Sequence, residues 1–157
     1  MTFEERVREA YMMGLNELPF YAALAEMAPN PVWAEQIRIM MENQMRHVQY
    51  PGSLIGMEMQ TMSAAEALQQ RRPTSFIEGI RQARVDEIRQ VMVFDELERM
   101  APTPEIKTRI QWIEFNQMRD TLFFAHVLAM MGAMPMSGMS SDQPYKYPSG
   151  IQGPPGF

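Results

Sequence analysis

Apolar and small residues recur every three or four positions through four long stretches of the chain, and short polar turns separate them. The first stretch covers residues 3–27, and the second runs from Pro31 to about Tyr50, where Pro51 is expected to stop a helix. Asn30 precedes the second stretch as an N-cap. This period of 3.6 residues predicts two amphipathic helices joined by a tight turn.

The same pattern returns in the second half of the chain. A third stretch covers residues 75–101, and a fourth begins at Pro104 and ends at Gly132. Residues 51–74 between the two halves contain proline and glycine and break the period, apart from a short helix expected to begin at Ser63. The chain therefore contains two helical hairpins separated by a long connection.

The two halves align without gaps when residues 2–47 are placed on residues 75–120, an offset of 73. Ordinary residue frequencies would give about three identities in such a window. Fourteen positions are identical, and in the first copy they are Phe3, Glu5, Arg8, Ala10, Leu24, Met27, Ala28, Pro29, Pro31, Ile37, Asn43, Gln44, Met45 and Arg46. Two unrelated amphipathic hairpins of shared composition remain the alternative, but the alignment favours a duplicated hairpin.

Two such hairpins are expected to pack as a four-helix bundle, because each exposes an apolar stripe too wide to leave in water. A helix of about 20 residues is about 30 Å long, and the connection over residues 51–74 can span that length. The second and third helices can then be parallel. We predict an all-α fold with one domain, residues 1–132, followed by a tail over residues 133–157.

Composition narrows the classes of partner and site. The net charge of −5 and pI near 5.1 oppose nucleic-acid binding, which needs a basic patch. No apolar run approaches the length of a membrane span, and the N-terminal residues lack the order of a secretory signal, so a cytoplasmic location is expected. The absence of cysteine excludes thiolate chemistry, Cys-ligated zinc and iron–sulfur centres. A metal would depend mainly on carboxylates.

Polar residues interrupt each apolar stripe near its middle: Glu17 in the first, Gln44 and His47 in the second, Gln90 in the third, and Gln117 and Asp120 in the fourth. With these positions and two hairpins, the chain over residues 2–132 resembles the ferritin-like superfamily, including rubrerythrin-like proteins. Those bundles bind two metals through a Glu from the first and third helices and a Glu-x-x-His from the second and fourth.

Carried over position by position, the resemblance keeps two of six ligands, Glu17 and the histidine at His47. The other four positions hold Gln44, Gln90, Gln117 and Asp120. A buried dimetal site needs about four carboxylates to neutralise two cations, and a glutamine oxygen is a weaker, neutral ligand. The departures argue against ordinary ferroxidase or oxidase chemistry.

Glu87 and Glu114 lie one turn before Gln90 and Gln117 and offer a compensating set of ligands. A shifted site could use Glu17, His47 and Glu114 for one iron or manganese ion and Glu87 with Asp120 for another. The alternative is a metal-free arrangement in which the three glutamines hydrogen-bond one another and His47 pairs with an acid. Both readings stay open at this stage.

The last part of the chain carries two further signals. Met130, Met131, Met134, Met136 and Met139 could bind Cu(I) through their thioethers or serve as adaptable packing, which is the more ordinary role. His126 is expected to be a packed or surface residue. The tail mixes tyrosine, phenylalanine, proline and glycine, a composition that suits either docking on a partner or an unstructured segment.

The sequence therefore predicts a ferritin-like bundle with an eroded dimetal centre that serves as a structural or assembly protein and forms homo-oligomers or contacts a partner through its tail. Some spore-coat proteins are similar in style, which implies a spore-associated location as a variant of the cytoplasmic one. The alternative function is an iron or manganese carboxylate protein with redox or peroxide chemistry.

Overall fold

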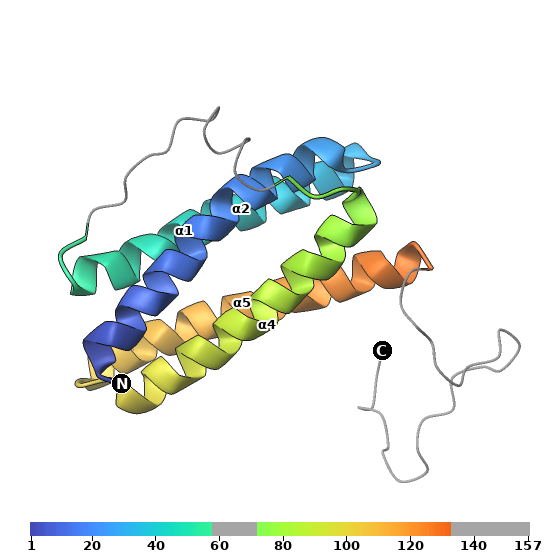
Figure 1. The fold of residues 1–157 in the computed structure, drawn as a ribbon. Coiled ribbons are helices and arrows are strands. Elements are labelled where there is room, and N and C mark those ends of the chain that lie inside the picture. The colour runs from blue at the N-terminus through green and yellow to red at the C-terminus, as the bar shows by residue number, and fades with distance from the viewer. Residues whose placement is uncertain (58–71, 133–157) are drawn as a thin grey trace, which may run out of the picture.

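The computed structural model describes residues 1–57 and 72–132, and this part of the chain is entirely helical, with no strand. Figure 1 shows four long helices lying alongside one another as a bundle. Their bounds are Phe3–Met27 for α1, Pro31–Leu54 for α2, Phe76–Met100 for α4 and Pro104–Met130 for α5. The all-α, four-helix prediction is confirmed.

Each helix begins at the N-cap that the sequence indicates. The side chains of Thr2 and Ser75 accept hydrogen bonds from the backbone N–H groups three residues later, and Thr2 also forms the reciprocal capping box with Glu5. Asn30 and Thr103 do the same before α2 and α5, which both start with proline. These caps satisfy N–H groups that the first helical turn leaves without partners, so the starts of the helices are fixed locally.

The predicted end of α2 at Tyr50 is wrong, because the helix continues through Pro51 to Leu54. A proline inside a helix costs about 3 kcal/mol, so tertiary packing must offset this cost. Pro51 and Gly52 are both buried, and a Cβ on Gly52 would lie 2.8 Å from the Tyr11 ring. This close contact with α1 holds the last turn of α2 in place.

The closely packed helix pairs are α1 with α2, α1 with α4, and α4 with α5. The pair formed by α2 and α5 is not among these closely packed pairs. In Figure 1, α1 and α5 run in one direction and α2 and α4 in the other, and α4 starts at the end of the bundle opposite to the end of α2. The connection between α2 and α4 therefore joins opposite ends of the bundle.

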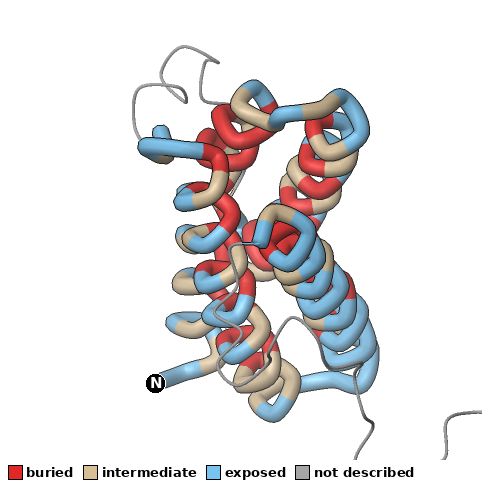
Figure 2. Tube along the Cα trace, turned by 90° about the vertical axis from the view of Figure 1, so that its right-hand side faces the viewer, coloured by how far each residue is buried: buried red, intermediate tan, exposed pale blue. Residues whose placement is uncertain are grey.

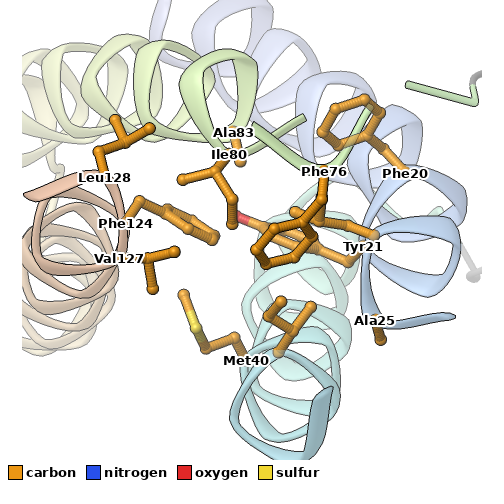
Figure 3. Close-up of a cluster of buried hydrophobic side chains, with 12 residues drawn as sticks. Phe20, Tyr21, Ala25, Met40, Phe76, Ile80, Ala83, Phe124, Val127 and Leu128 are labelled. Carbon is orange, nitrogen blue, oxygen red and sulfur yellow. The ribbon is translucent and has the colours of Figure 1, made fainter. Parts of the chain in front are cut away.

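The apolar core consists of two clusters, and buried positions follow the inward sides of all four helices (Figure 2). The larger cluster joins side chains from every helix, including Tyr21, Met40, Ile80 and Phe124 (Figure 3), and the Tyr21 and Phe124 rings stack with centroids 5.9 Å apart. The second cluster is built around Val7, Phe94, Leu97 and Ile110 with neighbours toward the other end of the helices. The polar positions lie between them in sequence on each helix.

Several predictions fall outside the described residues. These are the short helix expected at Ser63, the methionines from Met134 onward, and the role of the tail over residues 133–157. Met130 and His126, at the end of α5, are exposed. No helix in the described ranges is long and apolar enough to cross a membrane.

Gly14 lies where α1 packs closely against α2. A Cβ at this position would overlap Val48 Cγ2 and lie 3.3 Å from Gln44 Nε2. Valine is branched at Cβ and cannot turn its methyl group away freely. The absence of a side chain at Gly14 therefore lets α2 bring Gln44 against α1.

We predict that Gly14→Ala destabilises the protein by about 1–3 kcal/mol, because overpacking outweighs the gain of about 1 kcal/mol in helix propensity. Urea unfolding followed by circular dichroism measures this change. The Gly14→Ala, Val48→Ala double variant relieves the overlap, so its cost should be smaller than the sum of the two single costs. Strictly additive costs would contradict the close approach.

Candidate functional site

Seven buried polar side chains form a layer across the middle of the bundle, which we call the polar layer. Every helix contributes to it, and the layer lies between the two apolar clusters. Each member is at most 5% exposed: Glu17, Gln44, His47, Glu87, Gln90, Gln117 and Asp120. Seven of the eight predicted site residues thus lie in one buried region.

Hydrogen bonds from two glutamines converge on the Glu17 carboxylate, and a third glutamine joins the network through Gln90. Gln44 Nε2 donates to Glu17 Oε2 at 3.1 Å and to Gln90 Oε1 at 3.0 Å. Gln90 Nε2 donates to the same Glu17 Oε2, and Gln117 Nε2 donates to Gln90 Oε1. Gln44 and Gln117 thus both bond Gln90, as the sequence-based alternative expected, but the pairing of His47 with an acid that it also expected is not found among the described residues.

The side-chain amides of Gln44 and Gln90 direct the positive ends of their dipoles at the Glu17 carboxylate. The resemblance would place a metal cation beside this carboxylate. A buried carboxylate without donors or counter-charge is costly, and hydrogen bonds to an ionised acceptor are stronger than neutral ones. Gln90 stands beside Glu17, where a glutamate would bring a second negative charge and no donor. The amides of Gln44 and Gln90 therefore offset part of the cost of burying the Glu17 carboxylate.

His47 joins the layer through Gln44 rather than through an acid. Its Nδ1 lies 3.4 Å from Gln44 Oε1. Because the Gln44 amide nitrogen is already directed at Glu17, Oε1 is the free acceptor and Nδ1 must carry the proton. Burial lowers the pKa of His47 to about 4, with the nearby charges of Arg46 and Arg119 acting in the same direction. At neutral pH the imidazole is uncharged.

Glu87 and Asp120 form the second, more acidic part of the layer. Tyr21 donates its hydroxyl to Glu87 Oε1, a partner that the sequence did not indicate because Tyr21 reads as an apolar core position. Burial raises the pKa of Glu87 to about 8, and the neighbouring Asp120 adds to this rise. Burial also raises the pKa of Asp120 to about 6, against the lowering effect of Arg119. At neutral pH Glu87 therefore holds a proton.

Two buried oxygens in the layer, Glu87 Oε2 and Gln117 Oε1, have no hydrogen-bond partner in the described part of the chain. An unsatisfied buried acceptor costs about 1–3 kcal/mol. A proton on Glu87 avoids the larger cost of an unpartnered charge at this position. These two atoms are the least satisfied part of the site.

Glu114, the eighth predicted residue, lies apart from the others. It is half-buried, and its pKa is raised first by burial and then by Asp95 and Glu98 of α4. The structure therefore does not bring Glu114 together with His47. Sequence reasoning also missed Asp86 and Asn116, which are buried next to Glu87 and Gln117. The one sequence signal for their burial is that each directly precedes a residue on the inward side of its helix, Glu87 or Gln117.

The polar layer does not have the donor set of the dimetal site that the resemblance implies. Glu17 Oε2 already accepts two amide hydrogen bonds, and the His47 ring uses Nδ1 on Gln44. Within residues 1–57 and 72–132, no three His, Asp or Glu side chains are grouped so that they could hold a metal ion. The residues present fit a hydrogen-bonded network better than a pair of cations.

A groove of about 640 Å³ lies between α2 and α5, which are not among the closely packed helix pairs. His47 and Ile113 line it, so it borders both the polar layer and the second apolar cluster. Arg46 and Arg109 also line it, one from each helix. The groove connects the surface to the polar layer at His47.

Comparison with known proteins identifies no relative of this chain. Neither a protein-family model, nor a curated protein, nor a solved structure matches it.

The raised pKa of Glu87 makes stability depend on pH. Glu87 keeps its proton in the folded protein up to about pH 8, whereas the unfolded chain loses it near pH 4.5. The contribution of this group to the free energy of unfolding is therefore fully present below about pH 4.5 and is lost as pH rises through about 8. We predict that the free energy of unfolding falls by about 1 kcal/mol between pH 7 and pH 8. In the Glu87→Gln variant most of this decrease should be absent.

Urea unfolding at pH 6, 7, 8 and 9 tests this prediction. The exposed Glu35→Gln change, which also removes one carboxylate from a helix, serves as the control and should follow the unmodified protein. An unmodified protein with a flat profile over this range would show that Glu87 is ionised in the fold.

Proposed function

We propose that this protein is a ferritin-like four-helix bundle, built from a duplicated helical hairpin, whose dimetal centre has been replaced by a hydrogen-bonded amide and carboxylate layer. In this proposal it serves as a structural or assembly protein without ordinary ferroxidase activity. The observation that carries the proposal is the donation from Gln44 and Gln90 to Glu17. Those amides occupy with hydrogen bonds the carboxylate that a metal would otherwise neutralise.

The helix positions support the duplication. The starts and ends of α1 and α4 differ by 73 residues, and so do the starts of α2 and α5. The same offset relates Glu17 to Gln90 and Gln44 to Gln117, which meet in one hydrogen-bonded network. A duplicated hairpin explains why equivalent residues from both halves occupy the same layer.

An assembly role is supported by apolar side chains on the outer surface. Phe115, Met118 and Leu122 are exposed on the side of α5 opposite to its buried residues. Their spacing of three and four places them on one face of the helix. An exposed apolar strip of this kind supports a role of this surface in association.

A second candidate function is an iron or manganese carboxylate protein with redox or peroxide chemistry. The observation that favours it is the pair of unpartnered oxygens, Glu87 Oε2 and Gln117 Oε1. Asp120 lies near enough to Glu87 to influence its pKa. A cation between these groups would satisfy oxygens that otherwise lack partners.

Metal analysis separates the two candidates. After incubation with Fe(II) or Mn(II) and removal of free metal, we expect the protein to retain far less than one metal ion per chain, because the amides already satisfy Glu17. Mass spectrometry of metal content is the measurement. Stoichiometric metal that is lost in both His47→Ala and Glu87→Gln, and kept in the exposed control Glu35→Gln, would overturn the structural proposal in favour of the second candidate.

The assembly role predicts that a chain ending at Gly132 has fewer chains per particle in light scattering than the full chain, since residues 133–157 are proposed to contact a partner or a second copy. Far-ultraviolet circular dichroism of the shortened chain checks that the four helices remain. An unchanged number of chains per particle would remove the tail from the proposal. Loss of association in Phe115→Ser with the tail intact would instead assign assembly to α5.

A further inference from the structure

The groove between α2 and α5 has the features of a ligand site that borders the polar layer at His47. Its volume of about 640 Å³ is within the range of small-molecule pockets. Long, charged side chains, Arg46 and Arg109, stand at this junction, whereas apolar side chains such as Val7 and Leu97 fill the interior between α1 and α4. Two cationic side chains, one from each helix, therefore stand at the groove.

The two guanidinium groups at the groove lack carboxylate partners in the part of the chain that the structure describes. Arg46 donates to the amide oxygen of Asn43, a neutral group. The Arg109 guanidinium lies over the Tyr50 ring, 5.7 Å from its centroid. Glu105 is the one acidic side chain among the lining residues, and within residues 1–57 and 72–132 it forms no ion pair with either arginine. The lining keeps a local positive charge on a protein whose net charge is −5.

The walls of the groove are aromatic and aliphatic. Trp112 lines the groove with 66% of its surface exposed, and Tyr50 and Ile113 complete the apolar lining. An exposed tryptophan ring gains by being covered, and a flat apolar group can stack on it. The groove thus offers an apolar surface beside two cationic groups that can each bind an oxyanion through paired N–H donors.

We propose that the groove between α2 and α5 binds a small organic anion that has an aromatic or aliphatic body and a carboxylate, sulfonate or phosphate head. The body lies on Trp112, Tyr50 and Ile113, and the head lies between Arg46 and Arg109. Inorganic anions alone gain no apolar contact and bind weakly. The inference does not depend on the role of the polar layer, because none of these five side chains belongs to it.

Isothermal titration calorimetry with naphthalene-1-sulfonate tests the proposal, and naphthalene-1-sulfonamide provides a neutral probe of nearly the same shape. We expect saturable binding of the sulfonate, at least tenfold weaker binding of the sulfonamide, and no measurable binding of inorganic sulfate. Arg46→Gln and Arg109→Gln should each weaken sulfonate binding about tenfold, since each removes one charge-assisted contact. Trp112→Ala should weaken both naphthalene probes.

The matched control is Arg38→Gln, which removes an exposed arginine from α2, the helix that also carries Arg46. Arg38 does not line the groove, so its replacement should leave the affinity for the sulfonate unchanged. Equal affinity for the sulfonate and the sulfonamide overturns the proposal, and so does an effect of Arg38→Gln as large as that of Arg109→Gln. Sedimentation that shows a dimer dependent on Trp112 and unaffected by naphthalene-1-sulfonate would assign the groove to a second copy of the chain and overturn it as well. Circular dichroism confirms that each variant is folded.

Discussion

The burial of the Glu17 carboxylate is the constraint on which the rest of the interior depends. A carboxylate in the middle of a helical bundle needs a cation or several donors, because it has left water. Here the donors are the amides of Gln44 and Gln90, which come from α2 and α4. Gln117 extends the network to α5 through Gln90. The hydrogen bonds around one acidic group thus link all four helices at the same level of the bundle.

This requirement explains how the packing is arranged around the layer. The apolar core is divided into two clusters, because the polar layer occupies the section between them. Gly14 has no side chain to separate α1 from α2, so Gln44 can reach Glu17. The same layer holds a protonated Glu87 that accepts from Tyr21, which keeps a second buried acid uncharged at neutral pH. The hydrogen bonds of the buried polar groups therefore depend on the close contact between the helices.

His47 connects this interior to the surface. It bonds Gln44 on one side and lines the groove between α2 and α5 on the other. The groove and the layer nevertheless have different chemistry, since the layer is buried and rich in acceptors, and the groove carries arginine and aromatic side chains. A function of the layer and a binding role of the groove can be tested separately for this reason.

The sequence by itself determined the four helices, their N-caps and the polar positions, because caps and helical periodicity are local properties of the chain. Tertiary structure alone decided where α2 ends, since packing of Gly52 against Tyr11 stabilises a turn that Pro51 disfavours. It also separated Glu87 from Glu114. Both acids precede a buried glutamine by three residues, but Glu87 meets Tyr21 in the interior and Glu114 meets Asp95 and Glu98 at the side of α4. Spacing along a helix fixes a face only within about a quarter of a turn, and the neighbouring helix decides whether that face is buried or exposed.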